Sequence, residues 1–324
     1  MSNIDINAGA ITRRTFFSVA GLAALSLSAA SLFGCSGGSD AKGTSGDSSK
    51  KKITVAYVLN GKPTSFNDND NKPAGYEVDV VNAVADILSD KYTFKFEGVD
   101  QTAVFAGLAS GKYDQGLTNS FWTPERADKY LQPEEAVGAT LLGILVRKEN
   151  ADIRSLADAA KKGLKLAPIT AGDGNYYVVE DYNKKNADAQ IDLQATDDAN
   201  AFVEAFDWIA QGRYDMHVIP LQYYNELVVA DDGSYHKYVD DLAFIVIGAT
   251  KTWSFLTPDD KDYAADWDAA VKQLQSDGKL EELSRKWYSG IDNFAFLGDA
   301  TQTYNYLDEG VLIDPADESV LTER

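Results

Sequence analysis

Cysteine and histidine are scarce in this chain, with one cysteine and two histidines among 324 residues. A single cysteine, Cys35, allows no intramolecular disulfide and no cysteine-based metal cluster. His217 and His236 are isolated in the sequence, so a histidine-rich zinc site is not expected. The glycine-rich phosphate loop, the G-x-S-x-G turn and the H-E-x-x-H pair are also missing. The sequence therefore predicts no metal or other cofactor.

Positive charge is also in short supply: 30 lysines and arginines face 50 aspartates and glutamates, a net charge of −20 at pH 7. Residues 1–52 hold six of the basic side chains and three of the acidic ones, which leaves 24 basic against 47 acidic for the rest. Such a surface repels phosphate groups, which argues against nucleic-acid partners and against a body lying flat on an anionic membrane. With 44% hydrophobic and 25% charged residues, the composition is that of a globular protein long enough for two domains.

The N-terminus has the features of an export signal. Arg13 and Arg14 precede an uncharged run, Ser18–Cys35, that is too short and too rich in small residues for a good membrane span. This pattern resembles a bacterial twin-arginine signal, and "LFGC" resembles the lipoprotein processing box, in which the cysteine is lipidated. An ordinary buried thiol is the alternative for Cys35. We expect residues 1–35 to be this signal and residues 36–52, rich in Gly, Ser, Asp and Lys, to be a flexible linker. The body would then be anchored by lipid at the extracytoplasmic face of the cell membrane.

From Ile53 onward, short β-rich runs alternate with amphipathic helices, which predicts an α/β protein. In the segment 76–90, apolar residues recur at helical spacing and form one stripe: Val81, Val84, Ala85 and Leu88. The residues 53–59 and 92–99 are predicted to be strands, and 102–111 a helix. Further along, we expect a strand at 242–251 and two helices at 262–278 and 279–290. The tail from Asp292 is acidic and rich in turn residues, and we assign it no function.

Two short segments share one plan of helix end, glycine, basic residue, Tyr-Asp and strand. They are "LASGKYDQGLT" (Leu108–Thr118) and "IAQGRYDMHVI" (Ile209–Ile219), which begin 101 residues apart. Gly111 and Gly212 stand where the end of a helix favours a left-handed residue. We interpret the pair as equivalent steps in two similar α/β lobes, with a chance match as the alternative.

Five segments, taken in order, resemble one known family. "GYEVDVVNAVADIL" has the pattern glycine, aromatic, acid, aliphatic, acid, aliphatic at the start of a helix. It is followed by "VFAGLASGKYDQGLT", "TPERADKY", "SLADAAKKGLKLAPI" and "LQSDGKLEELSRKWY". Over residues 53–291 the chain is thus similar to the extracellular solute-binding proteins of family 3, the receptors of ABC importers for polar amino acids.

The resemblance implies a two-lobed, periplasmic-binding-protein-like fold of type II, with two crossover strands and a ligand cleft between the lobes. Lobe I would comprise residues 53–140 and 248–291, lobe II residues 141–247, and a C-terminal extension residues 292–324. It also implies a monomeric receptor, not an enzyme, that closes on a solute and delivers it to an ABC permease and ATPase complex.

The resemblance further implies that Arg126, in "TNSFWTPERADKY", binds the carboxylate of the ligand in a two-pronged ion pair. Backbone N–H groups and small side chains just before it would complete the anion site: Thr118, Asn119, Ser120, Phe121 and Thr123. The alternative for Arg126 is a surface ion pair with Glu125 or Asp128. Of the neighbouring aromatics Phe121 and Trp122, both could fill the core, or one could line the cleft.

The chain departs from the family pattern at two places. Pro220 stands where the family usually has the aspartate that binds an α-amino group, so Asp173, in "ITAGDGNYY", becomes the candidate for that role. A tight turn, with Asp173 bonding its own backbone, is the alternative. The aromatic expected near Asn60 is also missing, and the possible substitutes are Phe66, Tyr176 and Tyr177. We therefore expect a polar amino acid or a related small carboxylate as ligand.

Two other functions are compatible with this resemblance. A binding protein of the same fold could hand its closed form to a membrane receptor instead of a permease. Less favoured is an enzyme similar to cyclohexadienyl dehydratase, with a cleft carboxylate as general acid. A neighbouring permease gene would distinguish the first alternative, and turnover of a prephenate-like acid the second.

Overall fold

The computed structural model describes residues 50–198, 200–297 and 304–313, all within the compact unit Asp47–Arg324. The predicted export signal, its lipidation residue Cys35 and residues 36–49 of the predicted linker lie outside the described residues. The first strand begins at Lys51, so the last two residues assigned to the linker already belong to the fold.

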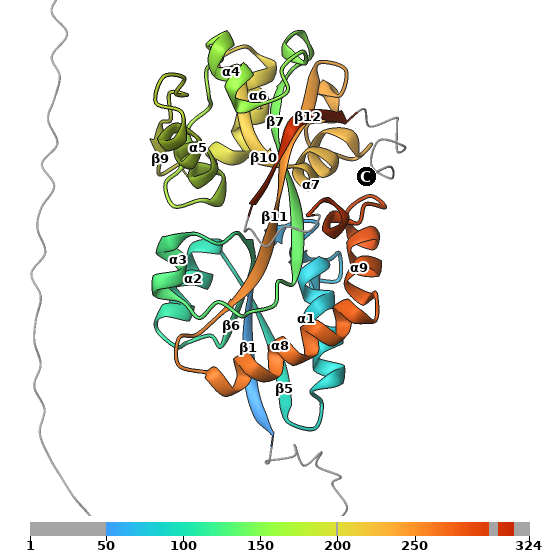
Figure 1. The fold of residues 1–324 in the computed structure, drawn as a ribbon. Coiled ribbons are helices and arrows are strands. Elements are labelled where there is room, and N and C mark those ends of the chain that lie inside the picture. Colours follow the sequence, from blue (N-terminus) through green and yellow to red (C-terminus); the bar gives the residue numbers. More distant parts are fainter. Residues whose placement is uncertain (1–49, 199, 298–303, 314–324) are drawn as a thin grey trace, which may run out of the picture. The chain divides into compact units, whose positions relative to one another are not determined.

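A mixed sheet forms the centre of the fold, with strands in the order β10-β7-β11-β6-β1-β5 and with β12 paired to β11 beside this path (Figure 1). The strands of this sheet are β1 Lys51–Val58, β5 Tyr92–Val99, β6 Gln115–Ser120, β7 Gly138–Arg147, β10 Met216–Pro220, β11 Leu242–Leu256 and β12 Tyr304–Ile313. Two small sheets consist of β2 Asn60–Gly61, β3 Ser65–Asn67 and β4 Pro73–Ala74, and of β8 Ile169–Thr170 and β9 Ala195–Thr196. The predicted α/β class is confirmed.

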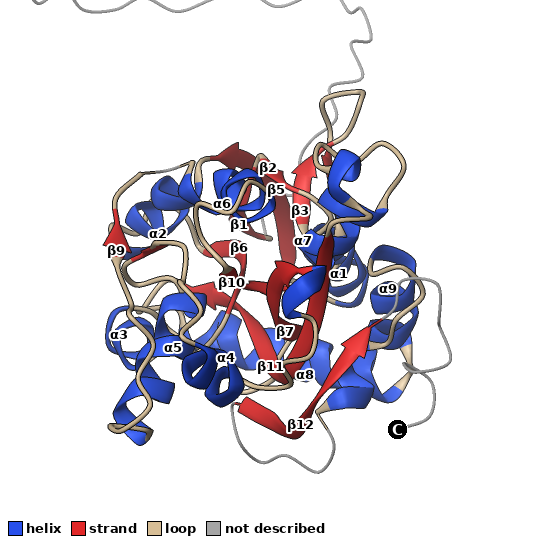
Figure 2. Ribbon diagram, turned by 90° about the horizontal axis from the view of Figure 1, so that it is seen from above, coloured by secondary structure: helices blue, strands red, loops and turns tan. Residues whose placement is uncertain are grey.

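Helices flank the strands on both sides (Figure 2). Those of the first lobe, which we define by β1, β5 and β6, are α1 Tyr76–Ile87, α2 Gln101–Ala109, α3 Pro124–Lys129, α8 Lys261–Ser276 and α9 Lys279–Trp287. Those of the second lobe, built on β10 and most of β7, are α4 Leu156–Lys162, α5 Gly174–Lys185, α6 Ala201–Ala210 and α7 Leu221–Tyr224. Shorter helical turns are η1 Lys148–Asn150, η2 Asn225–Val229, η3 His236–Tyr238 and η4 Asn293–Phe296.

Strand β11 connects the two lobes. It pairs with β7 from Leu242 to Thr252 and then with β6 from Trp253 to Leu256, both antiparallel. This change of partner explains why the strand runs five residues beyond the predicted end at residue 251. β7 is likewise buried along nearly all of its length, as an apolar run covered on both faces should be. These are the two crossover strands that the sequence resemblance implies.

The first lobe is built around the apolar stripe of α1. Val81 and Val84 are fully buried, Leu88 is buried just past the helix end, and Ala85 is half-buried, so the predicted stripe faces the core. The same cluster includes Trp267 of α8, whose side chain is 0% exposed. Complete burial of an aliphatic side chain contributes roughly 1.5–3 kcal/mol, so this packing is the main force that holds α1 and α8 on the sheet.

The second lobe has one apolar cluster on each face of its strands. Along β7, Ile144 and Val146 belong to one cluster, while Leu141 and Leu145 belong to the other. This alternation is the period-two pattern of a strand covered on both faces. Gly143 lies between them, and a Cβ there would overlap the ring of Phe244 on β11. Glycine is therefore required for the two crossover strands to approach each other.

The segment after α9 returns to the crossover strands. Asn293, in the short turn η4, is buried and donates from Nδ2 to the carbonyl of Ala139 on β7 at 3.0 Å. Further on, β12 runs antiparallel to β11, from Thr250 to Phe244. The tail from Asp292, which is acidic and rich in turn residues, thus adds a strand to the sheet.

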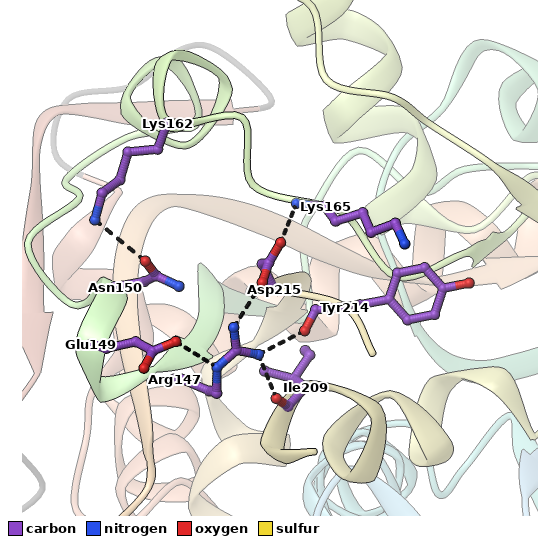
Figure 3. Close-up of polar contacts among 8 residues, drawn as sticks. All are labelled: Arg147, Glu149, Asn150, Lys162, Lys165, Ile209, Tyr214 and Asp215. Carbon is purple, nitrogen blue, oxygen red and sulfur yellow. Dashed lines mark hydrogen bonds and ion pairs between the residues drawn. The ribbon is translucent and has the colours of Figure 1, made fainter. Parts of the chain in front are cut away.

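The two Tyr-Asp turns occupy equivalent positions, as the sequence match predicts. Gly111 and Gly212 both have left-handed backbones, with φ of 70° and 77°. Each turn leads from a helix into a strand of the central sheet, from α2 into β6 and from α6 into β10. In the second turn, Arg147 at the end of β7 also donates hydrogen bonds to the carbonyls of Ile209 and Tyr214 and to the carboxylate of Asp215 (Figure 3).

The lobe boundaries at residues 140 and 248 stay a prediction.

Candidate ligand-binding site

In the loop between β6 and α3, local interactions start the helix that carries Arg126. Thr123 is the N-cap of α3, because its Oγ1 accepts a hydrogen bond from the Arg126 N–H at 3.2 Å. Pro124 occupies the first helical position, where its missing N–H costs nothing. The sequence Thr-Pro-Glu-Arg thus starts a helix and sets the arginine in its first turn.

The guanidinium of Arg126 links the two lobes. Nη1 donates to the carbonyl of Phe121 at 2.9 Å, and Nη2 donates to the carbonyl of Gly172, in the second lobe, at 3.4 Å. Its Cζ lies 5.3 Å from the ring centre of Phe105, within the range of a cation–π contact. Arg126 is only 9% exposed, which does not fit the alternative of a solvated surface ion pair, and the adjacent Glu125 pairs with Lys129 at 2.6 Å. Its contact with a ligand stays a prediction.

Phe121 packs on the start of α5 in the second lobe. A Cβ on Gly174 would overlap the Phe121 ring, so the ring lies directly on this glycine. Phe121 is 4% exposed and shares an apolar cluster with residues of the second lobe. Its neighbour Trp122 is half-buried and meets Tyr177 of α5 edge to face, with 6.4 Å between ring centres. Phe121 therefore behaves as a core residue, and Trp122 is the more accessible of the two aromatics.

Asp173 caps α5. Its Oδ1 accepts a hydrogen bond from the N–H of Asn175 at 2.9 Å, which is the bonding that the tight-turn alternative describes. The same side chain lies near Tyr223, because its charge contributes to raising the pKa of that tyrosine to about 12, after the larger effect of burial. A role in ligand binding stays a prediction for Asp173, as it does for the half-buried Tyr176.

The polar residues at the end of β6 are largely occupied by protein partners. The hydroxyls of Thr118 and Ser120 bond each other. The backbone N–H of Asn119 donates to Oε2 of Glu77, a buried carboxyl group, at 2.8 Å. The roles of Thr118, Asn119 and Ser120 in ligand binding stay predictions.

Glu77 is one of two residues near the site that were not among the predicted site residues. It is 0% exposed at the start of α1, and burial raises its pKa to about 8, although hydrogen bonds from Asn119 and Ser254 lower it. Its place in the "GYEVD" motif was the available signal. Tyr223, three residues after Pro220, was also missed, and Pro220 ends β10 with no side-chain acceptor to offer.

Several buried polar atoms around these elements have no hydrogen-bond partner among the described residues. Those on the elements that meet between the lobes are Asn119 Oδ1, Asn175 Oδ1, Gln222 Nε2 and Thr252 Oγ1. Buried polar atoms are normally satisfied, so a group of exceptions indicates sites that a polar ligand or water can bond. Together they offer acceptors and donors but no formal charge. No group of His, Cys, Asp and Glu within the described ranges is arranged to hold a metal ion.

Two α/β lobes, two crossover strands and a buried arginine between the lobes define a solute-binding protein of the two-lobed, type II class. The chain belongs to the bacterial extracellular solute-binding proteins, family 3, whose model matches residues 53–290. The family resemblance inferred from the sequence is thereby confirmed. Within the described ranges, helices of the length and apolarity needed to cross a membrane are absent.

Relatives with known ligands cover most of the chain. The L-cystine-binding protein TcyA of Bacillus subtilis (strain 168) is 28% identical over 274 residues, 81% of this chain and 94% of TcyA. The arginine-binding extracellular protein ArtP of the same organism is 27% identical over 250 residues, 75% of this chain and 89% of ArtP. Both relatives are binding proteins for amino acids.

A solved structure shows the same fold. It comes from work on glutathione import via GshT and the cystine ABC importer TcyBC of Streptococcus mutans. Its TM-score is 0.60, with 27% identity, and the match covers 74% of this chain and 96% of the other. The expected fold class is confirmed by this likeness together with the sheet topology.

Proposed function

We propose that this protein is the receptor of an ABC importer and binds a polar amino acid or a related small carboxylate between its lobes. Closure of the lobes would present the loaded receptor to a permease and ATPase complex. The protein would act as a monomer at the extracytoplasmic face of the cell membrane.

The observation that carries this proposal is the position of Arg126. Its guanidinium is largely buried, lies between a loop of each lobe and donates to a carbonyl from each. A guanidinium has five N–H donors in a flat fork, so it can bond a carboxylate while it keeps backbone contacts. Charge-assisted hydrogen bonds of this kind are about twice as strong as neutral ones, most of all where water is excluded.

The character of the remaining site points to a ligand with neutral polar groups beyond its carboxylate. The unpartnered atoms of Asn119, Asn175, Gln222 and Thr252 are amide and hydroxyl groups. Two of the similar proteins above bind L-cystine and arginine, so we take L-cystine and L-arginine as the first probes. Asp173 and Tyr176 of α5, with Trp122, would contact the part of the ligand that sets selectivity.

The lipid anchor belongs to the same proposal and rests on the sequence alone. Cleavage of the chain just before Cys35, followed by acylation of that cysteine, would hold the body by the linker 36–52. Mass spectrometry of the membrane fraction tests it: a diacylglyceryl-modified N-terminal cysteine is expected, and an unmodified, released protein would contradict the anchor.

A thermal-shift screen of the purified protein tests the receptor function. A ligand that binds only the folded state must raise the melting temperature. We expect L-cystine, L-arginine or a related carboxylate to do so, and we expect Arg126→Ala to abolish the shift. Arg285→Ala removes an exposed arginine of α9 and serves as the matched control. A shift that survives Arg126→Ala would overturn the assigned site, and turnover of a prephenate-like acid would replace the receptor by the enzyme alternative.

A further inference from the structure

Glu77 joins α1, β6 and β11 at the base of the loop between β6 and α3, which carries Arg126 and which we call the ligand loop. From the start of α1, its Oε2 accepts the N–H of Asn119 at 2.8 Å, and its Oε1 accepts the hydroxyl of Ser254, on β11, at 3.3 Å. The carboxyl group is fully buried, so both bonds form away from solvent. A buried acid that bonded no protein group would be strongly unfavourable, and these contacts show what the acid is used for.

The start of α1 is fixed in place, so the carboxyl group has a defined position. The N–H of Tyr76 donates to the carbonyl of Pro63 at 3.1 Å, and the N–H of Glu77 donates to that of Thr64 at 3.0 Å. Gly75 has φ of 118°, and a Cβ there would lie 2.5 Å from the Thr64 carbonyl oxygen. Only glycine fits at this point, which is the reason for the residue that opens the motif.

The chain bends at Asn119, just before the ligand loop. Its φ is 47°, a left-handed conformation that is unfavourable for residues other than glycine, although asparagine tolerates it better than most. Ser120 follows and pairs with Trp253 of β11, and after it come Phe121 and the N-cap of α3. The direction of the chain toward Arg126 is therefore set at Asn119.

We propose that Glu77 is a positioning residue, whose carboxyl group holds Asn119 in its left-handed conformation so that the loop and Arg126 are ready to receive the carboxylate of the ligand. This inference rests on the proposed function and adds a residue that touches no ligand itself. Glu77 also accepts a hydrogen bond from Ser254, so it links the start of the loop, at Asn119, to β11, the strand that connects the lobes.

The surroundings of Glu77 contain no compensating cation among the groups that shape its titration. Tyr76 of α1, Tyr223 of α7 and Tyr288 at the end of α9 all have pKa values raised first by burial and further by the charge of Glu77. Two neutral donors, one from β6 and one from β11, are the hydrogen-bond partners of this carboxyl group, and their bonds lower its pKa without cancelling the effect of burial. A glutamine can replace it, because its carbonyl accepts from Asn119 and its amide donates to the Ser254 hydroxyl.

The test is a set of four variants with L-cystine and L-arginine as probes, measured by calorimetry: Glu77→Gln, Glu77→Ala, Asn119→Gly and the double variant Glu77→Ala with Asn119→Gly. We expect Glu77→Ala to raise Kd by roughly tenfold or more and Glu77→Gln to stay within about threefold. Glycine adopts positive φ without help, so the double variant should recover most of the affinity, to within about threefold of Asn119→Gly alone.

A cavity at position 77 that merely loosened the fold would not be repaired by a glycine at position 119. A double variant as weak as Glu77→Ala, or a Glu77→Ala variant that binds as well as the wild type, would overturn the proposal. If Glu77→Ala does not fold, Asn119→Ala replaces it, since alanine disfavours positive φ while Glu77 stays intact. It should weaken binding by a similar factor, and unchanged binding would count against the proposal.

A ligand-free measurement separates this inference from the proposed function. Hydrogen exchange of the Asn119 amide should be slow in the wild type and in Glu77→Gln, and at least roughly tenfold faster in Glu77→Ala. If neither probe binds the wild type, the receptor proposal fails for them while the exchange result still decides the role of Glu77. Equal exchange in all variants would overturn that role.

Discussion

The turn Leu108–Thr118 in the first lobe and the turn Ile209–Ile219 in the second have the same backbone bonds but different supports. Asp114 accepts from the N–H of Thr54 at 2.7 Å, and its own N–H donates back to the Thr54 carbonyl at 2.9 Å. Asp215 forms the same two bonds with Lys165, at 3.0 and 2.8 Å. The two lobes thus repeat one detail of hydrogen bonding as well as one sequence pattern.

The difference is an arginine. Arg147 donates to Asp215 at 2.7 Å, to the carbonyls of Ile209 and Tyr214 at 2.8 and 2.9 Å, and to Glu149 at 2.9 Å (Figure 3). It uses the full fork of its guanidinium to bind two carbonyls and two carboxylates at once.

The arginine stands where the second lobe has less strand pairing. In the first lobe, β1 pairs with β5 over its whole length and with β6 as well. The equivalent segment of the second lobe, at Leu166, meets Met216 by a single isolated bridge. Arg147 donates to the carbonyl of Ile209 in the second turn, whereas in the first turn the corresponding carbonyl of Leu108 accepts from Oγ1 of Thr257 at 3.4 Å. The comparison teaches that the stability of a repeated turn depends on contacts with its surroundings, and that these contacts differ between the two lobes.

Carboxyl groups in the two lobes also respond to pH in opposite directions. Burial raises the pKa of Glu77 in the first lobe to about 8. Partial burial acts to raise the pKa of Asp215 too, but its bonds from Arg147 and the Lys165 N–H outweigh this and lower it. The first group favours folding when it is protonated, and the second favours folding when it is ionised.

The largest effect is expected from pH. An unfolded glutamate titrates near 4.5, so between that pH and about 8 the folded state keeps a proton on Glu77 that the unfolded state releases. Stability should fall as pH rises through this window, by about 1.4 kcal/mol per unit of pKa difference and several kcal/mol in all.

Urea unfolding at pH 5, 6.5 and 8 measures this effect. Glu77→Gln should lack the fall, whereas Asp215→Asn should keep it and should differ less from the wild type as the pH drops below about 4. Parallel pH profiles for the wild type and Glu77→Gln would show that Glu77 does not titrate in this range.

The support given by Arg147 predicts the next largest effect. Arg147→Ala removes the donor to Oδ1 of Asp215 and to two carbonyls, and it should lower the free energy of unfolding by about 3 kcal/mol. Arg147→Lys should recover less than half, because an ammonium cannot reproduce the fork. Arg154→Ala, an exposed arginine of the same lobe, should cost no more than about 0.5 kcal/mol. Equal losses at the two arginines would remove the distinction between the turns.

The smallest effect tests what the turns share. Gly111→Ala and Gly212→Ala should each cost about 1 kcal/mol, because an L side chain disfavours the left-handed backbone in both. A Cβ on Gly111 meets nothing within 4 Å, and one on Gly212 meets only Nη1 of Arg147 at 3.8 Å. Thermal or urea unfolding of both variants checks this, and a difference of more than about 0.5 kcal/mol would mean that the turns are not equivalent.

Patterns within a short stretch of sequence predicted much of this fold. The strand at 92–99 and the helix stripe of Val81, Val84 and Leu88 follow from periodicity alone. The left-handed backbone of Gly111 and of Gly212 follows from residue chemistry at the end of a helix. In each case the cause and the effect lie within a few residues of each other.

Features that depend on distant partners were not predictable in the same way. The bond from Asn119 to Glu77 joins residues 42 positions apart, and that from Arg147 to Asp215 joins residues 68 apart. Strand β11 ends later than predicted because it changes its pairing partner from β7 to β6, and no local sequence pattern indicates such a change. For the candidate site, the sequence singled out Arg126 and its loop, but it did not show that the Asn119 amide bonds the distant Glu77.

The most direct test of the central claim is calorimetric titration of the purified wild type, Arg126→Ala and Arg285→Ala with L-cystine and L-arginine. We expect one of these ligands to bind the wild type and Arg285→Ala equally, and the loss of Arg126 to weaken binding by about a hundredfold or more, because two charge-assisted bonds disappear. Binding that is equally strong in Arg126→Ala would contradict the account, since the carboxylate would then be held somewhere else.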